Sequence, residues 1–219
     1  YAGEHSESLL ARRGLAAYAR HPLLRCVGID RTYYRPVNVE TLAAYRAEVP
    51  DGFRFVVKAH EDVTLPRFTS HARYGARSGQ ENSRYLDAAY ATDAVVAPAV
   101  EGLGTTLGPV VFQFSPDRSR SPDDALRFAE RLEAFLAGLP CGPLYAVELR
   151  TRAFLTPQYA DALARTGAVH CLNVHPSMPS LAEQWTRIAI EDGRALVVRW
   201  MLGAGMKYEE ARDRYAPFN

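Results

Sequence analysis

The sequence lacks an excess of charge of either sign. Its 219 residues include 26 Lys and Arg against 25 Asp and Glu, which leaves a formal net charge of +1 at pH 7. Such a balance provides no overall basic field of the kind that drives binding to nucleic acids or to membrane surfaces, although it is compatible with a local basic patch. We therefore expect no membrane partner.

Cysteine is also scarce. Cys26, Cys141 and Cys171 are an odd number, have no CxxC spacing, and each lies in or beside an apolar run. This pattern argues against a disulfide framework and predicts buried, reduced thiols, as in a reducing cytoplasm.

Long apolar runs are missing as well. No run approaches the roughly 18 residues that suggest a membrane span, and the N-terminus has no signal-peptide pattern. A chain of this length with 47% hydrophobic residues fits one α/β domain. We expect a single cytoplasmic domain.

Nucleotide-binding motifs are equally absent. Gly102 and Gly104 lack the third glycine and the preceding strand that a dinucleotide loop needs, and there is no Walker pattern. We expect no cofactor.

What the sequence does contain is an alternation of short β-like runs with longer amphipathic stretches, which is typical of βα units around a parallel sheet. Several of the runs are almost continuously apolar, as strands covered on both faces should be. Six strands are predicted: Leu24 to Ile29, Phe53 to Ala59, Val110 to Phe114, Tyr145 to Leu149, Val169 to Val174 and Ala195 to Met201.

Helix-capping residues mark the stretches between these strands. The clearest helix runs from Ser121 to Leu139, with Ser121 as N-cap and Pro122 at the first helical position. Thr156 and Pro157 begin another helix, with Gly167 as its C-terminal cap. The other predicted helices are Leu9 to Arg20, Val39 to Glu48, Ser83 to Thr92 (capped by Asn82) and Ser180 to Gly193.

Polar residues end these apolar strands, and several are spaced i and i+2, so that they point to the same face. In a parallel barrel all such strand ends lie at one rim, where barrel enzymes place their chemistry. The candidate substrate-binding residues are Asp30, Thr32, Tyr34, His60, Gln113, Asn173, His175 and Arg199, and the candidate catalytic residues are Lys58, Glu148 and Arg150.

Three of these residues carry the expected chemistry. Glu148 is the best general acid or base, and Arg150 beside it either orients it or binds a substrate carboxylate or phosphate. Lys58 is expected to bind an anion, with proton transfer or a Schiff base as its alternatives. For each of them a solvated or structural ion pair is the competing interpretation. Tyr33 and Tyr34 offer rings on which a sugar or base could stack.

A catalytic metal held by Asp30, His60, Glu148 and His175 is a further alternative. No local spacing such as HExxH supports it, and the lysine and arginines at the same rim disfavour a cation, so we expect no metal.

The segment from Leu65 to Gln80 follows a strand end without hydrophobic periodicity and is a candidate active-site loop, or simply a mobile surface loop. It carries Arg67, Arg73 and Arg77, with Arg84 just beyond, and Tyr74 and Tyr85 are interleaved. Aromatic residues among arginines can bind nucleic acid, which is our less favoured hypothesis. We prefer a hydrolase or lyase acting on a small anionic or polyhydroxylated molecule; a third hypothesis is a barrel that binds a metabolite without turnover.

The strand ends also carry a resemblance to a known family. IleAspArgThrTyrTyrArgPro at 29 to 36, ValProAspGlyPheArgPheValValLysAla at 49 to 59, LeuGlyProValValPheGlnPheSerPro at 107 to 116 and AlaValGluLeuArg at 146 to 150 resemble the domain of unknown function 72 family, also called YecE-like. The resemblance implies a TIM (β/α)₈ barrel and singles out Lys58, Gln113, Glu148 and Arg150, but implies no reaction.

The sequence departs from the family pattern in places. Gly28 and Asp30 stand where many members have Glu-x-Asn, and Leu65 stands where they have a histidine. The family's opening and closing strands are expected before Tyr1 and after Asn219. Since six strands cannot close an eight-stranded barrel, we expect a barrel whose first and last strands are missing from this chain.

Overall fold

The computed structural model describes residues 14–116, 121–188, 195–202 and 208–215. Six parallel strands in these ranges form one sheet in chain order. All six predicted strands are confirmed, and the largest shift is at the third, which begins at Leu107 instead of Val110. The strands are β1 (Cys26–Ile29), β2 (Arg54–Lys58), β3 (Leu107–Gln113), β4 (Tyr145–Glu148), β5 (Val169–Asn173) and β6 (Val197–Arg199).

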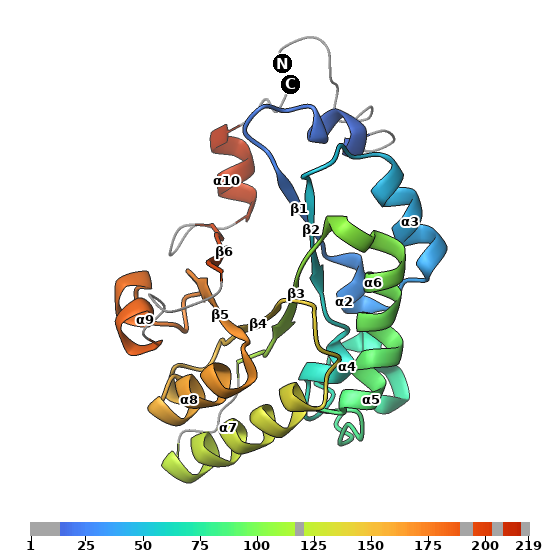
Figure 1. Cartoon of the computed structure of the whole chain (residues 1–219). Helices are drawn as coiled ribbons and strands as arrows, with labels where there is room; N and C mark the ends of the chain where they lie inside the picture. The colour runs from blue at the N-terminus through green and yellow to red at the C-terminus, as the bar shows by residue number, and fades with distance from the viewer. Residues whose placement is uncertain (1–13, 117–120, 189–194, 203–207, 216–219) are drawn as a thin grey trace.

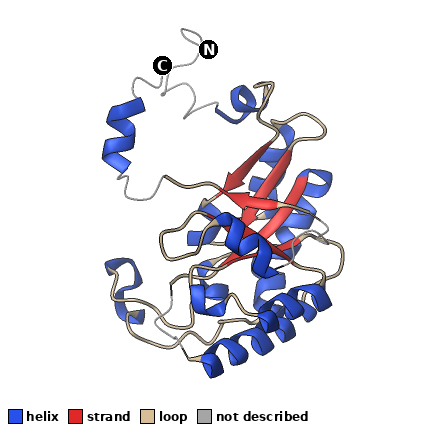
Figure 2. Ribbon diagram, turned by 90° about the vertical axis from the view of Figure 1, so that its left-hand side faces the viewer, coloured by secondary structure: helices blue, strands red, loops and turns tan. Residues whose placement is uncertain are grey.

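The sheet is a half-barrel flanked by helices. α3 (Val39–Ala47) and α6 (Ala97–Leu103) lie outside β1 and β2, and α7 (Pro122–Ala137) and α8 (Pro157–Thr166) lie outside β4 and β5 (Figure 1). Figure 2 shows the strands from the side, gathered at the centre of the molecule. Within the ranges described, β1 and β6 are the two open edges of the sheet, so a closed barrel is not confirmed.

The two faces of the sheet carry different side chains. Phe55, Val57, Phe112 and Val147 point outward and are buried in the main hydrophobic core, which the helices complete. The inner, concave face carries a smaller apolar cluster. It is made by Val56, Val111, Ala146, Val169, Cys171 and Val197.

The helix caps predicted at Ser121, Thr156, Gly167 and Ser180 are confirmed. The hydroxyl of Ser121 accepts a hydrogen bond from the backbone N–H of Asp124 at the start of α7, and Thr156 caps α8 in the same way. Gly167 ends α8 in the left-handed conformation, with φ of 69°. α9 (Leu181–Ile188) begins as expected after Ser180, while its predicted end at Gly193 lies outside the described residues.

The helix predicted from Ser83 to Thr92 is wrong at both ends. It begins five residues later, because the side chain of Asp87 caps α5 (Ala88–Ala91), and it continues through a π-helical turn (Thr92–Val96) into α6. Asn82, the predicted cap, instead donates hydrogen bonds to the backbone oxygens of Asp62 and Leu65, at 2.6 and 2.7 Å. Asn82 therefore forms a tertiary contact instead of the helix cap that the local sequence predicted.

The remaining short elements lie mostly at the strand ends. They are α2 (Arg31–Tyr34), α4 (Glu61–Thr64), the 3₁₀ turns η1 (Ala72–Arg77), η3 (Gly104–Thr106) and η4 (Arg152–Phe154), and the separate helix α10 (Tyr208–Tyr215); of the predicted helix from Leu9 to Arg20, residues 14–19 are described and helical.

The prediction of free cysteines is confirmed for all three residues, and the prediction that they are buried is confirmed for one and wrong for two. All three thiols are free, but only Cys171 is buried. Cys26 is exposed because β1 is an open edge, and Cys141 is exposed in the turn after Pro140. Helices long and apolar enough to cross a bilayer do not occur in the described ranges.

α3 and α6 cross at Gly102, where the two backbones approach closely. A Cβ atom at this position would lie 2.6 Å from Cβ of Leu42 and 2.8 Å from the carbonyl oxygen of Val39. We expect Gly102→Ala to lower the free energy of unfolding by about 2 kcal/mol, because overpacking outweighs the better helix propensity of alanine. Urea denaturation measures this change.

Gly28→Ala is the matched control, because a Cβ atom there meets no atom within 4 Å. Its free energy of unfolding should stay within about 0.5 kcal/mol of the parent value. Equal stability of the two variants would contradict the close helix crossing.

Candidate functional site

The site is a layer of polar side chains on the inner face of the half-barrel. Each lies two residues beyond a member of the inner apolar cluster, and side chains two apart on a strand share a face. Gln113 is in register with Glu148 on the neighbouring strand, and Asn173 with Arg199. The layer consists of Lys58, Gln113, Glu148, Asn173 and Arg199, at the C-terminal ends of β2 to β6.

Glu148 is at the centre of this layer and is completely buried, with 0% of its surface exposed. Its Oε1 accepts a hydrogen bond from Nε of Arg150 at 3.0 Å, and its Oε2 accepts one from Nη1 of Arg199, also at 3.0 Å. One buried carboxylate is therefore enclosed by two guanidinium groups, which offsets the cost of removing it from water.

Gln113 completes the arrangement around the two arginines. Its Oε1 accepts hydrogen bonds from Nη2 of Arg150 at 2.8 Å and from Nη1 of Arg199 at 2.5 Å. Both guanidinium groups are thus fixed by neighbouring strands. Arg150 and Arg199 remain partly accessible, with 18% and 32% of their side-chain surface exposed, so their other N–H groups can reach a ligand.

Lys58 lies in the same layer but is held differently. Its Nζ makes no hydrogen bond with any residue that the structure describes; the nearest carboxylate oxygen, on Asp30, is 3.8 Å away. Burial, followed by the positive charge of Arg199, lowers the pKa of Lys58 to about 8. A fraction of the amine is therefore neutral at physiological pH.

Two tyrosines follow β1, and one of them is buried while the other is exposed. The ring of Tyr33 is buried, and Nζ of Lys58 lies 4.2 Å from its centroid, a cation–π distance. Tyr34 is 59% exposed. Asp30 is mostly exposed at the rim, where it lies 4.0 Å from Nη2 of Arg199. Tyr33 therefore forms part of the site, while Tyr34 can contact a ligand only from outside.

Thr32 and Asn173 have structural hydrogen bonds. The hydroxyl of Thr32 lies 2.6 Å from the carbonyl oxygens of both Ile29 and Lys58. Asn173 is fully buried, donates to the carbonyl oxygen of Leu149 at 3.0 Å and accepts from the backbone N–H of His175. Both residues therefore fix strand ends beside the site.

The two candidate histidines also have protein partners. His60 is buried, Nδ1 lies 2.8 Å from the hydroxyl of Tyr90, and burial lowers its pKa. Nδ1 of His175 lies 2.7 Å from the hydroxyl of Ser177, which donates to the carbonyl oxygen of Arg150. Burial and the charge of Arg150 lower the pKa of His175. His175 is thus next to the arginine pair, while His60 contacts Tyr90 on α5.

The loop from Leu65 to Gln80 is folded around two buried carboxylates. Arg73 forms an ion pair with Glu61, and Arg77 and Arg84 both contact Asp62, at 3.4 and 3.2 Å. Glu61 and Asp62 are 4% and 2% exposed, and sequence reasoning did not select them. The signal that could have found them is a pair of acidic residues within four positions of the end of β2 at Lys58.

The nucleic-acid hypothesis depended on the arginines of this loop. Arg67, the fourth, pairs with Glu81 at 3.1 Å. Aromatic rings take part as well, since the guanidinium of Arg77 lies 4.4 Å from the ring centroid of Phe68 and that of Arg84 lies 4.4 Å from the ring centroid of Tyr90. Four arginines thus face three carboxylates, because Arg77 and Arg84 share Asp62. Most of the positive charge of this loop is therefore already paired within the protein, which weakens its attraction for phosphate.

A metal ion has no evident ligand set in the described part of the chain, where no three His, Cys, Asp or Glu side chains converge. Of the four residues considered for a metal, Glu148 is enclosed by arginines and His60 faces Tyr90.

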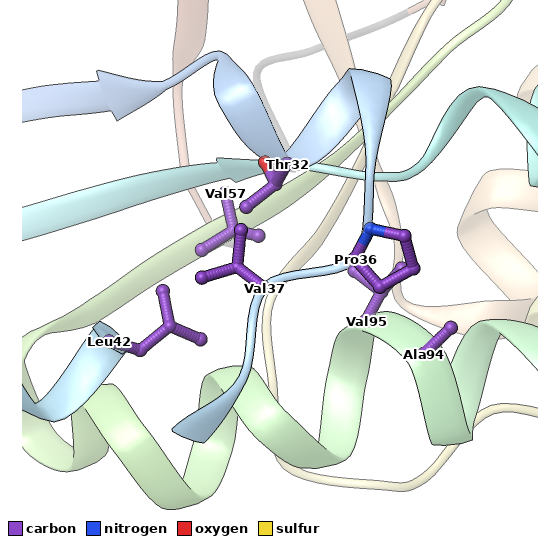
Figure 3. A pocket seen from close by; sticks show the side chains of 7 residues that line it. All are labelled: Thr32, Pro36, Val37, Leu42, Val57, Ala94 and Val95. Carbon is purple, nitrogen blue, oxygen red and sulfur yellow. The ribbon is translucent and has the colours of Figure 1, made fainter. Parts of the chain in front are cut away.

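Two hollows elsewhere do not include the polar layer. A cavity of about 10 Å³, room for about one water molecule, lies beside Thr32 and is otherwise lined by apolar side chains (Figure 3). An open hollow of about 450 Å³ lies where the N-terminal ends of α7 and α8 meet. Because Lys58, Glu148 and Arg150 line neither, the site is defined by its charged groups and not by either hollow.

Known proteins with the same fold were found by comparison of the sequence and of the structure. The model of the family described as protein of unknown function DUF72 matches residues 4–218. Two crystal structures of a DUF72 family protein from Enterococcus faecalis V583 are similar. One has a TM-score of 0.54 and 15% identity over 90% of this chain and 88% of the other; the second has 0.55 and 19% over 91% and 68%. At these identities the likeness shows the fold alone. No curated protein matches.

Proposed function

Because the chain belongs to the family of proteins of unknown function DUF72, whose description names no reaction, we propose from its own geometry that it is an enzyme acting on a small anionic substrate. The observation that carries the proposal is the convergence of three cationic side chains, Lys58, Arg150 and Arg199, around a single buried carboxylate at the C-terminal rim. Counting Glu148 and excluding the exposed Asp30, this layer has an excess of positive charge.

The excess charge favours a carboxylate or phosphate group as the ligand. Arg150 and Arg199 are held in fixed orientations by Glu148 and Gln113, and an oriented guanidinium group loses little entropy on binding an oxyanion. The partly buried rim also lowers the effective dielectric constant, which strengthens the attraction. A small anion is therefore a better fit than an extended polymer.

Lys58 is the group best suited to proton transfer in this proposal. With a pKa of about 8, roughly a tenth of the amine is neutral at pH 7, and that fraction can accept a proton. Glu148 takes a positioning role in place of the acid–base role expected from the sequence, because it is buried and each of its oxygens accepts a hydrogen bond from an arginine. The preferred reaction classes remain hydrolase and lyase.

Oxalate binding tests the anion site, since oxalate is a small dianion that undergoes no reaction. We expect the unmodified protein to bind oxalate in isothermal titration calorimetry and Lys58→Gln to bind it about tenfold more weakly, since a charge-assisted contact in a partly buried site contributes about 1.4 kcal/mol. Asp30→Asn should bind more tightly, because it removes a carboxylate 3.8 Å from Lys58 and 4.0 Å from Arg199.

Arg127→Gln is the control for loss of one positive charge, because Arg127 lies exposed on α7 and forms an ion pair with Asp124 of the same helix. Its oxalate affinity should equal that of the unmodified protein. Absence of oxalate binding, or equal weakening in Arg127→Gln and Lys58→Gln, would contradict a specific anion site.

A further inference from the structure

Lysine is rare in this chain, and one of its two lysines lies in the site. The sequence contains 24 arginines and only two lysines, Lys58 and Lys207. Arginine keeps its proton under all ordinary conditions, whereas a lysine amine becomes neutral when burial and neighbouring cations disfavour its charge. If the site needed only a third cation, arginine would serve as elsewhere in the chain. A primary amine at position 58 supplies something that a guanidinium group cannot, namely a nucleophilic nitrogen.

The surroundings of Lys58 suit a nucleophile. Only 12% of its side chain is exposed, its Nζ makes no hydrogen bond with a described residue, and the ring of Tyr33 covers one side. A neutral amine can therefore form without breaking a hydrogen bond. Arg199 and, more weakly, Arg150 disfavour the ammonium form further, whereas the carboxylates of Asp30 and Glu148 favour it; burial and the arginines prevail, and the pKa of Lys58 is lowered. Neighbouring cations of this kind activate lysines towards carbonyl carbons.

The same two arginines define which carbonyl compounds fit. Fixed by Glu148 and Gln113, they can hold a carboxylate, and a carbonyl carbon adjacent to that carboxylate then lies at the rim beside Lys58. A 2-oxo acid has both groups on neighbouring atoms. Arg150 and Arg199 would bind any small carboxylate, but the amine of Lys58 can react only with one that also has a carbonyl group. The site therefore fits 2-oxo acids better than carboxylates without a carbonyl group.

We infer that Lys58 is a nucleophile that forms an imine with the carbonyl carbon of a small 2-oxo acid bound by Arg150 and Arg199. The lone pair of Nζ attacks the carbonyl carbon to form a C–N bond. The carbonyl oxygen then leaves as water with the two protons of the amine, and protonation of the nitrogen gives an iminium ion that can accept electrons from a neighbouring bond. The inference rests on the proposed anion site.

Reductive trapping tests this step. We expect pyruvate and sodium cyanoborohydride, added to the full chain, to leave one reduced pyruvate on Lys58, identified by mass spectrometry of peptides. Lys207 is the internal reference, and its labelling at pH 7.5 should be at least about tenfold lower. Oxalate should protect Lys58 by competing for the arginines. Lys58→Gln should lose the label at position 58.

The pH dependence separates an activated amine from a merely accessible one. The rate of labelling at Lys58 should rise with a midpoint at about pH 8, in line with its lowered pKa. In Arg199→Gln the rate of labelling at pH 7.5 should fall several-fold, because one of the two arginines that bind the carboxylate is lost. The midpoint should also move to higher pH, because a positive charge near Lys58 is lost. Arg127→Gln should behave as the unmodified protein.

The outcomes distinguish the inference from the function on which it rests. If oxalate binds but pyruvate leaves no label on Lys58, or labels Lys58 and Lys207 equally, the imine is overturned and the anion site stands. If oxalate does not bind, the anion site fails and the imine fails with it.

Discussion

Glu148→Gln is expected to lower the free energy of unfolding by about 3–5 kcal/mol, the range found when one partner of a buried ion pair is removed. The carboxylate is 0% exposed and accepts hydrogen bonds at 3.0 Å from both Arg150 and Arg199. The amide keeps the shape but removes the carboxylate that both partly buried guanidinium groups share, which leaves Arg199 with the exposed carboxylate of Asp30, 4.0 Å away. It also turns an N–H donor towards one of the two guanidinium groups. Urea denaturation at pH 7 measures the loss.

Glu133→Gln is the matched control. Glu133 on α7 also pairs with an arginine, accepting two hydrogen bonds of 2.8 Å from Arg165, but this pair lies on the surface. Exposed ion pairs contribute little, because water and salt screen them, so this variant should be nearly as stable as the parent. If Glu148→Gln were as well tolerated as Glu133→Gln, Glu148 would not be the residue that holds the arginines in place.

The alternation of side chains along strands explains why sequence alone could locate the polar layer. Lys58, Gln113, Glu148 and Arg199 each end an apolar strand, and the structure brings all four to the inner rim of the half-barrel. A rule that depends only on a two-residue period and on parallel strand order needs no knowledge of distant contacts.

The same pattern could not reveal which polar residues are already occupied. Asn173 follows the same spacing as Glu148, yet its amide bonds to the backbone of Leu149 on the neighbouring strand. Thr32 likewise contacts the carbonyl oxygen of Lys58. Whether a polar group at a strand end faces a ligand or satisfies the backbone depends on the register of neighbouring strands, which one sequence does not specify.

In the loop after β2, the sequence likewise could not reveal which charged side chains are already paired. Its arginines form a basic cluster along the sequence, but Arg73, Arg77 and Arg84 fold onto Glu61 and Asp62, which lie up to 22 positions away. A local count of charges therefore overestimated the basic character of the surface.

The predicted start of the helix after Asn82 was wrong because a contact with a distant part of the chain competes for this side chain. The side chain of Asn82 supports the turn at Asp62 and Leu65, so the next suitable cap, Asp87, begins the helix. Capping at Ser121 and Thr156 was predictable because each hydroxyl accepts its hydrogen bond from a backbone N–H three positions further along the chain, a purely local contact.

His170 gives the second large effect, a loss of stability in mild acid. Its ring is buried between α8 and α9, with Nδ1 2.8 Å from the hydroxyl of Tyr159 and Nε2 3.2 Å from Oε1 of Gln184. Burial lowers the pKa of His170 from 6.5 to about 4. Between pH 6.5 and about pH 4, His170 is therefore mostly protonated in the unfolded chain and mostly neutral in the folded chain.

The contribution of His170 to stability is complete above about pH 6.5 and is lost as the pH falls through about 4. Between pH 7 and pH 5 the loss amounts to about 2 kcal/mol for this one residue. His170→Gln, whose amide can still reach Gln184 and has no proton to gain, should show a pH dependence of the free energy of unfolding that is weaker by this amount.

Comparing the two proteins by urea denaturation at pH 7 and pH 5 isolates the contribution of His170, because the carboxylates that also titrate are common to both. The variant should be less stable than the parent at pH 7, since it removes the 2.8 Å hydrogen bond between His170 and the Tyr159 hydroxyl, and the difference should shrink in acid. A stability difference that stays constant from pH 7 to pH 5 would mean that the folded protein protonates His170 as readily as the unfolded chain does. In that case the buried ring could not be neutral, and the Tyr159–His170–Gln184 contacts behind the Asn173 strand end would have to rearrange in acid.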